Sequence, residues 1–180
     1  ILKMKKIFIY SIMGLMVSCS SNKTIESPKE ILAICQINSA NESSVYGEAK
    51  FVQINNKVII NVEVKGLSYG LHAIHIHEFG DCSSLDAKSA GGHWNPNNKK
   101  HGEWGSESHH KGDIANLFAD SSGNSSLKFE TDLWCLDCKD ESKNILGKSI
   151  IIHKGLDDFH SQPSGNAGKR IGCGIINLIL

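Results

Sequence analysis

The sequence predicts an all-β domain, either a sandwich or a barrel, on the basis of two observations. From Ile31 onward, short runs rich in β-branched and aromatic residues recur, and turns rich in Gly, Asn and Ser separate them. No segment after Cys19 shows a sustained helical period of apolar residues. About eight short strands joined by such turns are typical of sandwiches and barrels.

The first three strands are expected in the runs ILAICQI, VYGEAKFVQI and KVIINVEVKGL. In the third run, apolar side chains recur at every second position, at Val58, Ile60, Val62 and Val64. This alternation is typical of a strand with one buried face. Five further strands are expected at residues 71–77, 112–119, 125–130, 148–153 and 171–178.

Two intervals between these strands are unusually long, at residues 78–110 and 154–170. Loops of this length in a compact domain are usually functional. His, Asp, Gly and Arg concentrate in both of them. We therefore expect the functional site to be formed by these two loops and the strands beside them.

The amino-terminal residues have the composition of an export signal. Lys3, Lys5 and Lys6 precede the apolar run IFIYSIMGLMV, and no acidic residue occurs before Cys19. The apolar part is too short to remain as a membrane-spanning helix, which needs about 20 residues. The run MVSC ending at Cys19 resembles a bacterial lipobox, in which the cysteine becomes the lipidated first residue. An ordinary cleavable signal with a chance cysteine is the alternative.

The chain therefore divides into a signal peptide at 1–18, a lipid-anchored flexible tether at 19–30 and a single domain at 31–180. The 19 Lys and Arg residues balance 19 Asp and Glu residues. Loss of residues 1–18 removes three lysines and leaves 16 basic against 19 acidic residues. This balance gives no indication of nucleic-acid binding. We expect an exported protein of the periplasm or cell envelope, held to the membrane by its lipid.

Histidines are clustered, since seven of the nine lie between His72 and His110. In a strand, His75 and His77 project from the same face about 7 Å apart, close enough to hold one ion, whereas His72 falls on the opposite face. Downstream, three imidazoles and one carboxylate lie in or next to a Gly- and Asn-rich segment and form a closed tetrahedral set that suits zinc. These are His93, His101, His110 and Asp113. His153 can complete an all-nitrogen copper site with His75, His77 and His93.

Four segments carry a family resemblance over residues 65–176: GLHAIHIHEFGDC, SAGGHWNPNNKKHG, HHKGDIANL and GNAGKRIGCGII. They resemble the signature segments of copper/zinc superoxide dismutases. The resemblance implies an eight-stranded Greek-key β-barrel, related to the immunoglobulin-like sandwich, with two long functional loops. It also implies an enzyme that disproportionates superoxide to dioxygen and hydrogen peroxide by alternate reduction and oxidation of a histidine-bound copper.

The resemblance also implies one copper and one zinc per subunit and assigns their ligands. Copper falls on His75, His77, His93 and His153. Structural zinc falls on His93, His101, His110 and Asp113. His93 then bridges the two ions, and it is expected to take part in catalysis by taking a proton and returning it to the product.

Further residues receive supporting roles from the same resemblance. His72 supports the copper-ligand loop through its hydrogen bonds, and Asp157, rather than Asp158, tethers a copper ligand to a zinc ligand. Arg170 attracts and orients the small anion at the rim of the copper channel. Cys82 and Cys173 form an intrasubunit disulfide, which should stabilise the fold by roughly 4 to 5 kcal/mol.

Other cysteines and histidines fit the family less directly. Cys135 and Cys138 form a Cys-x-x-Cys pair that departs from the family pattern; we expect a local second disulfide, with a copper-handling role as the alternative. Cys35 is expected to be a buried free thiol. His109 and His160 are expected to be solvated.

The second long loop is shorter than in familiar animal enzymes and lacks their acidic and lysine pattern. Electrostatic steering of the substrate is therefore expected to come from Lys99, Lys100 or Lys169. Superoxide is the expected small-molecule substrate, and the sequence allows a homodimer without indicating one.

Two other functions are weighed against the dismutase. The first is a non-catalytic metal-binding protein on the same fold, such as a copper chaperone or a zinc reservoir. The second is a zinc hydrolase, for which Glu78 is the obvious water-activating carboxylate, although the chain has no His-Glu-x-x-His motif.

Overall fold

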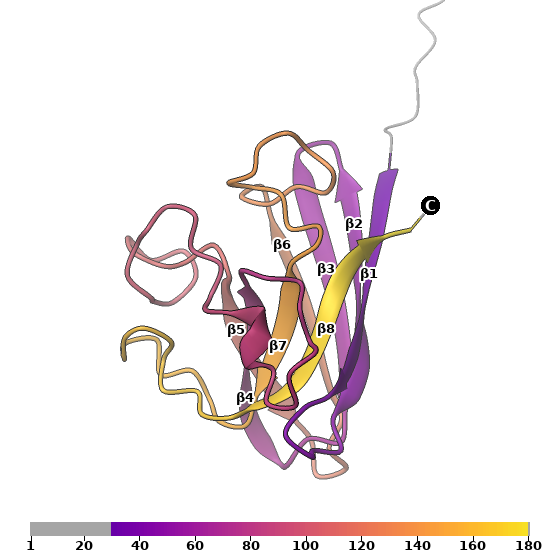
Figure 1. The fold of residues 1–180 in the computed structure, drawn as a ribbon, viewed down its shortest axis with the longest axis vertical. Helices are drawn as coiled ribbons and strands as arrows, with labels where there is room; N and C mark the ends of the chain where they lie inside the picture. The colour runs from indigo at the N-terminus through magenta and orange to yellow at the C-terminus, as the bar shows by residue number, and fades with distance from the viewer. Residues whose placement is uncertain (1–29, 180) are drawn as a thin grey trace, which may run out of the picture.

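Eight strands form the body of the domain in the computed structural model, which describes residues 30–179 (Figure 1). The strands are β1 (Glu30–Ser39), β2 (Tyr46–Ile54), β3 (Lys57–Lys65), β4 (Gly70–His77), β5 (Asp113–Ala119), β6 (Ser125–Thr131), β7 (Ser149–His153) and β8 (Arg170–Leu178). Every expected strand is present, and each end lies within two residues of its predicted position. The predicted signal peptide, Cys19 and most of the tether lie outside the described residues.

The strands pair in the order β5-β4-β7-β8-β1-β2-β3-β6, and every pair is antiparallel. The strands at the two ends of this order, β5 and β6, follow each other in the chain, so the sheet curls into a nearly closed barrel. The connections from β3 to β4 and from β6 to β7 pass over to strands that are not neighbours, as in a Greek key. The predicted all-β Greek-key barrel is confirmed.

Alternation along the strands decides which side chains reach the core. In β3, Val58, Ile60, Val62 and Val64 are all buried and belong to the main hydrophobic cluster, as their spacing predicts. Apolar side chains at every second position remove one face of the strand from water, and this burial drives the strand onto its neighbours. The polar residues between them remain exposed.

The same alternation directs His75 and His77 of β4 away from the core. Ile74 and Ile76 point into the main hydrophobic cluster, so His75 and His77 point outward. Both histidines are nevertheless fully buried, because loops cover this side of the barrel. Figure 1 shows connection 78–112, which contains a 3-10 turn at Lys88–Ala90, and connection 154–169 on the same side of the barrel as β4 and β7.

A third long connection, 132–148 between β6 and β7, was not singled out from the sequence. It is fixed to the first long loop by Trp134, which is buried and whose indole Nε1 donates to the Lys111 carbonyl over 2.8 Å. The part of the chain that the structure describes contains no helix of the length and hydrophobicity needed to span a bilayer.

Candidate metal centre

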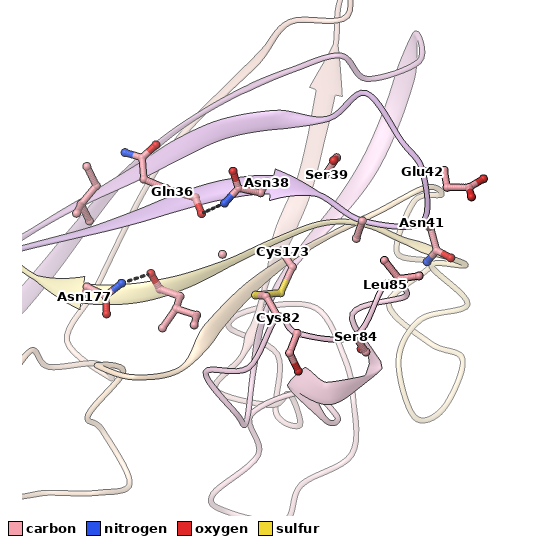
Figure 2. A pocket seen from close by; sticks show the side chains of 15 residues that line it. Gln36, Asn38, Ser39, Asn41, Glu42, Cys82, Ser84, Leu85, Cys173 and Asn177 are labelled. Carbon is pink, nitrogen blue, oxygen red and sulfur yellow. Dashed lines mark hydrogen bonds between the residues drawn. A yellow bond between two sulfur atoms is a disulfide. The ribbon is translucent and has the colours of Figure 1, made fainter.

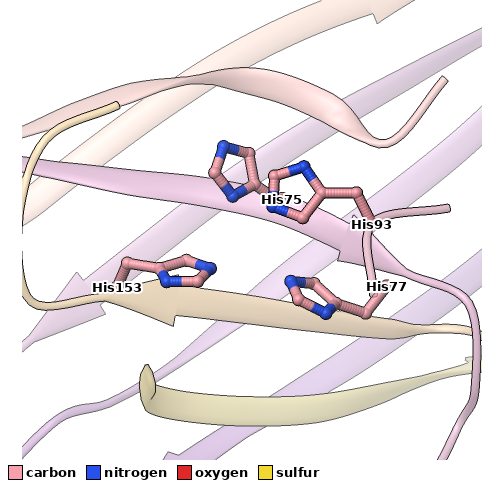
Figure 3. Close-up of side chains that lie close together, drawn as sticks. All are labelled: His75, His77, His93 and His153. Carbon is pink, nitrogen blue, oxygen red and sulfur yellow. The ribbon is translucent and has the colours of Figure 1, made fainter. Parts of the chain in front are cut away.

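Four imidazole rings from three separate segments meet beside β4 and β7. The ring centroids of His75 and His77 lie 6.5 Å apart, near the spacing expected for alternate strand residues. The ring of His93, from the first long loop, lies 4.0 Å from that of His75 and 5.0 Å from that of His77. His153 ends β7, and its ring is 5.7 Å from that of His77. Figure 3 shows the rings of His77 and His153 pointing toward each other, with those of His75 and His93 beside them.

Irregular strand pairing helps to aim these rings. The register between β4 and β5 shifts between Ile74 and His75, and that between β7 and β8 shifts between Ile152 and His153. A bulge re-aims the side chain that follows it, and bulges concentrate at functional sites. An isolated β-bridge between His77 and His93 holds the loop histidine against the end of β4.

A second set of four groups shares His93 with the first. Asp113 lies at its centre: Oδ1 is 2.8 Å from His93 Nδ1, and Oδ2 is 3.0 Å from His101 Nδ1. His110 Nδ1 lies 3.3 Å from Asp113 Oδ1. In each set the atoms that can bind an ion lie within 4.8 Å of one another, and all the residues are buried. The structure thus brings together both sets of residues expected from the sequence.

Six imidazole nitrogens in these sets are buried and make no well-formed hydrogen bond among the described residues, although Nδ1 of His101 and of His110 lie 3.0 and 3.3 Å from Asp113 oxygens. They are Nδ1 of His75, His101 and His110 and Nε2 of His77, His93 and His153. An unsatisfied buried polar atom is costly, about 1 to 3 kcal/mol, so six of them aimed at two small spaces indicate a missing partner. Bound metal ions satisfy such nitrogens. The residues therefore fit the two metals that the sequence predicts.

The opposite nitrogen of each ring is held by the protein, which fixes the ring direction. His77 Nδ1 donates to the Gly91 carbonyl over 2.9 Å, and His110 Nε2 donates to the Lys99 carbonyl over 3.1 Å. His72 differs from the ligand candidates, because both of its nitrogens have protein partners. Its Nδ1 donates to the His153 carbonyl over 3.0 Å, and its Nε2 faces Ser68.

Burial sets the protonation of several ligand candidates. It lowers the pKa of His77 and His153 well below the usual range, and burial together with the nearby His75 lowers the pKa of His93 to about 4. These rings are therefore neutral at pH 7, which is the form that binds metal. Burial alone would also lower the pKa of His101, but Asp113 and Asp157 raise it to about 9. A metal ion must therefore displace a proton from His101.

One carboxylate, that of Asp157, links the two sets through the ring nitrogens that face away from the ion positions. Asp157 Oδ2 accepts from His75 Nε2 over 2.7 Å, and Oδ1 accepts from His101 Nε2 over 2.8 Å. The amide of Asn116 on β5 exchanges two hydrogen bonds with the Asp157 backbone, of 2.7 and 3.0 Å. Asp158 has another task, since its carboxylate accepts from the backbone N–H groups of residues 160 and 161.

Arg170 lies at the mouth of the first set. Its Nη1 donates to the Ala87 carbonyl and its Nη2 to the Gly91 carbonyl, both over 2.7 Å. The Gly91 carbonyl also accepts from His77, so one backbone group positions both a ring and the guanidinium. Arg170, together with Lys99, lines an open cavity of about 620 Å³ that reaches three of the four histidines. Lys100 also lines it, whereas Lys169 does not.

Comparison with known proteins identifies the family. Residues 45–176 match the family described as copper/zinc superoxide dismutase (SODC). The chain is 39% identical over 167 residues to copper/zinc superoxide dismutase 2 of Aquifex aeolicus, covering 90% of this chain and 92% of that protein. The chain belongs to the copper/zinc superoxide dismutase family. Copper/zinc superoxide dismutase 1 of the same organism is 42% identical over 135 residues, covering 72% of this chain and 79% of that protein.

The dismutase is therefore an enzyme that acts on superoxide, with copper and zinc as cofactors. The copper chaperone for superoxide dismutase of Rattus norvegicus is 33% identical over 140 residues, but the match covers only 48% of that protein. The hydrolase alternative fails on geometry, because the second set offers four protein ligands and no open position. Glu78 belongs to neither set, and its Oε1 accepts from the Gly92 N–H over 2.9 Å.

The dismutase contains a disulfide between Cys82 and Cys173, which are 91 positions apart in the chain, with Cα atoms 5.8 Å apart. It borders a cavity of about 570 Å³ next to β1 and β8 (Figure 2). This bond fastens the first long loop to β8 three residues after Arg170. The same loop provides the Ala87 and Gly91 carbonyls that hold Arg170, so the crosslink helps to fix the guanidinium.

The remaining cysteines and histidines of the part of the chain that the structure describes belong to neither set. Cys135 and Cys138 form a local disulfide, and Cys35 is a buried free thiol whose pKa burial raises to about 12. His160 is exposed, as expected. His109 is partly exposed, so it keeps contact with solvent on one side. It packs 4.9 Å from the Trp104 ring, in an aromatic cluster that the spacing of the sequence does not reveal.

Sequence reasoning missed the two side-chain amides that hold the backbone near the metals. Asn116 exchanges two hydrogen bonds with Asp157, and Gln162 exchanges two with His101. Asn116 lies within the segment HHKGDIANL and Gln162 lies in none of the four segments, but neither is a metal-ligating residue type and amides are common in strands and loops, so residue type gave no signal. Only the three-dimensional pairing of distant segments identifies them.

Proposed function

We propose that the dismutase disproportionates superoxide at a copper ion held by His75, His77, His93 and His153, with zinc held by His93, His101, His110 and Asp113. The observation that carries this assignment is that six buried imidazole nitrogens without a well-formed hydrogen bond belong to two compact ligand sets that share the His93 ring. Copper, when bound, supplies one-electron chemistry with superoxide, whereas zinc has no redox chemistry and supplies fixed charge. Asp157 accepts a hydrogen bond from each of His75 and His101 and so fixes the orientation of the two rings relative to each other.

His93 is positioned to handle a proton as well as metal. Its Nε2 faces the copper set without a protein partner, and its Nδ1 faces Asp113 on the zinc side. Formation of hydrogen peroxide from superoxide needs one electron and two protons. His93 is one of the residues that line the cavity, so its Nε2 can hold one proton there and give it to the reduced anion, and solvent in the open cavity supplies the second proton.

Arg170 has the role of binding and orienting the substrate anion. Two backbone carbonyls hold the guanidinium in place, and its remaining N–H groups, which have no acceptor within residues 30–179, can donate to an anion in the cavity. A pre-positioned cation costs little reorganisation when the substrate arrives. Lys99 and Lys100 line the same cavity and are the better candidates for long-range steering, with Lys169 less well placed.

The Arg170→Ala variant is expected to keep both metals and to lose catalytic efficiency by about 10- to 100-fold, since attraction of the anion is lost. Rapid mixing with superoxide at several ionic strengths measures this loss and the expected weaker dependence on salt. Arg170→Lys keeps the positive charge but loses the planar guanidinium group. Its catalytic efficiency is expected to lie between those of the wild type and Arg170→Ala. An unchanged catalytic efficiency in Arg170→Ala would show that this residue does not guide the anion.

The metal assignment is tested on the purified wild-type chain loaded with copper and zinc. We expect one copper and one zinc per chain by elemental analysis, and two anomalous scattering peaks separated by the His93 ring. Selective removal of copper is expected to abolish turnover and leave zinc in place. Bound zinc with no copper and no turnover would instead favour a non-catalytic metal-binding protein.

We also propose that the enzyme is exported and attached to the cell envelope through a lipid on Cys19. The two disulfides of the described residues are typical of oxidising compartments outside the cytoplasm. The lipobox-like run that ends at Cys19 suggests the attachment. Mass spectrometry of the mature amino terminus tests this, and a first residue other than a lipidated Cys19 would reject it. A homodimer remains a prediction.

A further inference from the structure

Gln162, in the second long loop, holds the backbone of the zinc-ligand candidate His101 at two points. Its Oε1 accepts from the His101 N–H over 3.0 Å, and its Nε2 donates to the His101 carbonyl over 2.9 Å. Neither backbone group of His101 has another hydrogen-bond partner within residues 30–179. One side-chain amide therefore supplies the pair of hydrogen bonds that a neighbouring strand would supply.

The segment that carries Gln162 is braced by its own hydrogen bonds. The Asp158 carboxylate accepts from the backbone N–H groups of His160 and Ser161 over 2.9 and 2.8 Å. The Asp158 N–H donates to the Gly165 carbonyl over 3.0 Å, and the Gly165 N–H donates to Ser161 over 2.7 Å. Because this turn is already ordered, fixing the amide of Gln162 costs less conformational entropy.

The same loop also holds the His101 ring. Asp157 Oδ1 accepts from His101 Nε2 over 2.8 Å. The loop therefore hydrogen-bonds to the side chain of His101 through Asp157 and to its backbone through Gln162. Contacts at two separated points fix the direction of a ring, whereas one contact leaves it free to pivot. The buried Nδ1 of His101, which makes no well-formed hydrogen bond, then points toward Asp113, whose Oδ2 lies 3.0 Å away.

We propose that Gln162 is a positioning residue for the zinc site, which sets the direction of His101 Nδ1 and thereby the rate at which zinc is lost. The inference rests on the proposed ligand assignment. Gln162 also lines the substrate cavity, but both polar atoms of its amide are engaged with His101. Its effect is therefore exerted on the zinc side.

The test compares Gln162→Met, which keeps the length of the side chain and removes its hydrogen bonds, with the wild-type enzyme loaded with copper and zinc. Zinc transfer to a chromophoric chelator is expected to be about 10-fold faster in the variant, the loss typical of an outer partner of a metal ligand. With Co²⁺ in place of zinc, the visible absorption bands are expected to shift. Gln36→Met, on the outer surface of β1, is the matched control and should behave as wild type.

Gln162→Glu separates the two hydrogen bonds, because a carboxylate still accepts from the His101 N–H but cannot donate to its carbonyl. We expect zinc transfer at a rate between those of wild type and Gln162→Met, and this variant carries the comparison if Gln162→Met does not fold. A role in folding alone would lower the melting temperature of the metal-free protein and leave the Co²⁺ bands of the folded variants unchanged. Unchanged bands and unchanged zinc transfer would overturn the proposal. A wild-type chain that binds no zinc would instead overturn the ligand assignment.

Discussion

Replacement of His75 by alanine is expected to abolish superoxide turnover while leaving most of the zinc bound. The variant removes one nitrogen from the copper set, and that set then retains His77, His93 and His153. The zinc set loses no ligand. Asp157 loses one of its two histidine partners but keeps His101, so zinc affinity is expected to fall by no more than about 10-fold.

Elemental analysis of the variant and an assay of superoxide consumption check both halves of this expectation. His110→Ala is the complementary variant and is expected to lose zinc first, because its Nδ1 belongs only to the zinc set. His160→Ala is the matched control, since that ring is exposed and belongs to neither set. If His75→Ala lost zinc as completely as copper, the division of the ligands between two ions would be wrong.

The strands were predictable because their burial follows a local rule. Val58, Ile60, Val62 and Val64 alternate in the sequence, and all four enter the core. The same period predicted that His75 and His77 share a face, and the strand geometry bears this out. A period of two residues is a property of each strand alone, so it can be read without knowing which strands pair.

The ligand sets could be predicted because histidine clusters of this density are uncommon and the segments resemble one family. The distinction between Asp157 and Asp158 came only from that resemblance, since two adjacent aspartates look equivalent in the sequence. The structure supplies the physical reason for it. Asp157 is buried between two rings, whereas Asp158 is at the surface and closes a turn.

Contacts between distant segments could not be predicted by any local rule. Connection 132–148 reaches the metal loop through Trp134, and Lys111 accepts its hydrogen bond 23 residues away in the sequence. Gln162 finds His101 at a separation of 61 residues. Such pairs depend on how the barrel closes, and the residue types involved also occur at many positions where they make no such contact.

The close approach of Gly165 to Asp157 and His101 requires glycine at this position. The Gly165→Ala variant is therefore expected to lose both zinc affinity and stability. The residue has a φ of +65°, and a Cβ built there would overlap Asp157 Oδ1 and lie 2.7 Å from His101 Nε2. The added methyl group must displace the Asp157 carboxylate from the His101 ring, whose orientation that carboxylate fixes. Backbone strain and overpacking together should lower the free energy of unfolding by about 2 to 4 kcal/mol. Zinc affinity should fall by about 10-fold or more.

Gly147→Ala separates backbone strain from the clash. Gly147 has a similar φ of +71°, but a Cβ there meets no atom within 4 Å among the described residues. This variant should therefore lose only about 1 kcal/mol of stability and should bind zinc as the wild type does. Chemical denaturation of the metal-free proteins and competition for zinc with a chelator measure the two effects. Because the two glycines share the strained backbone and differ in their neighbours, equal zinc affinity in both variants would mean that the Asp157–His101 contact does not govern zinc binding.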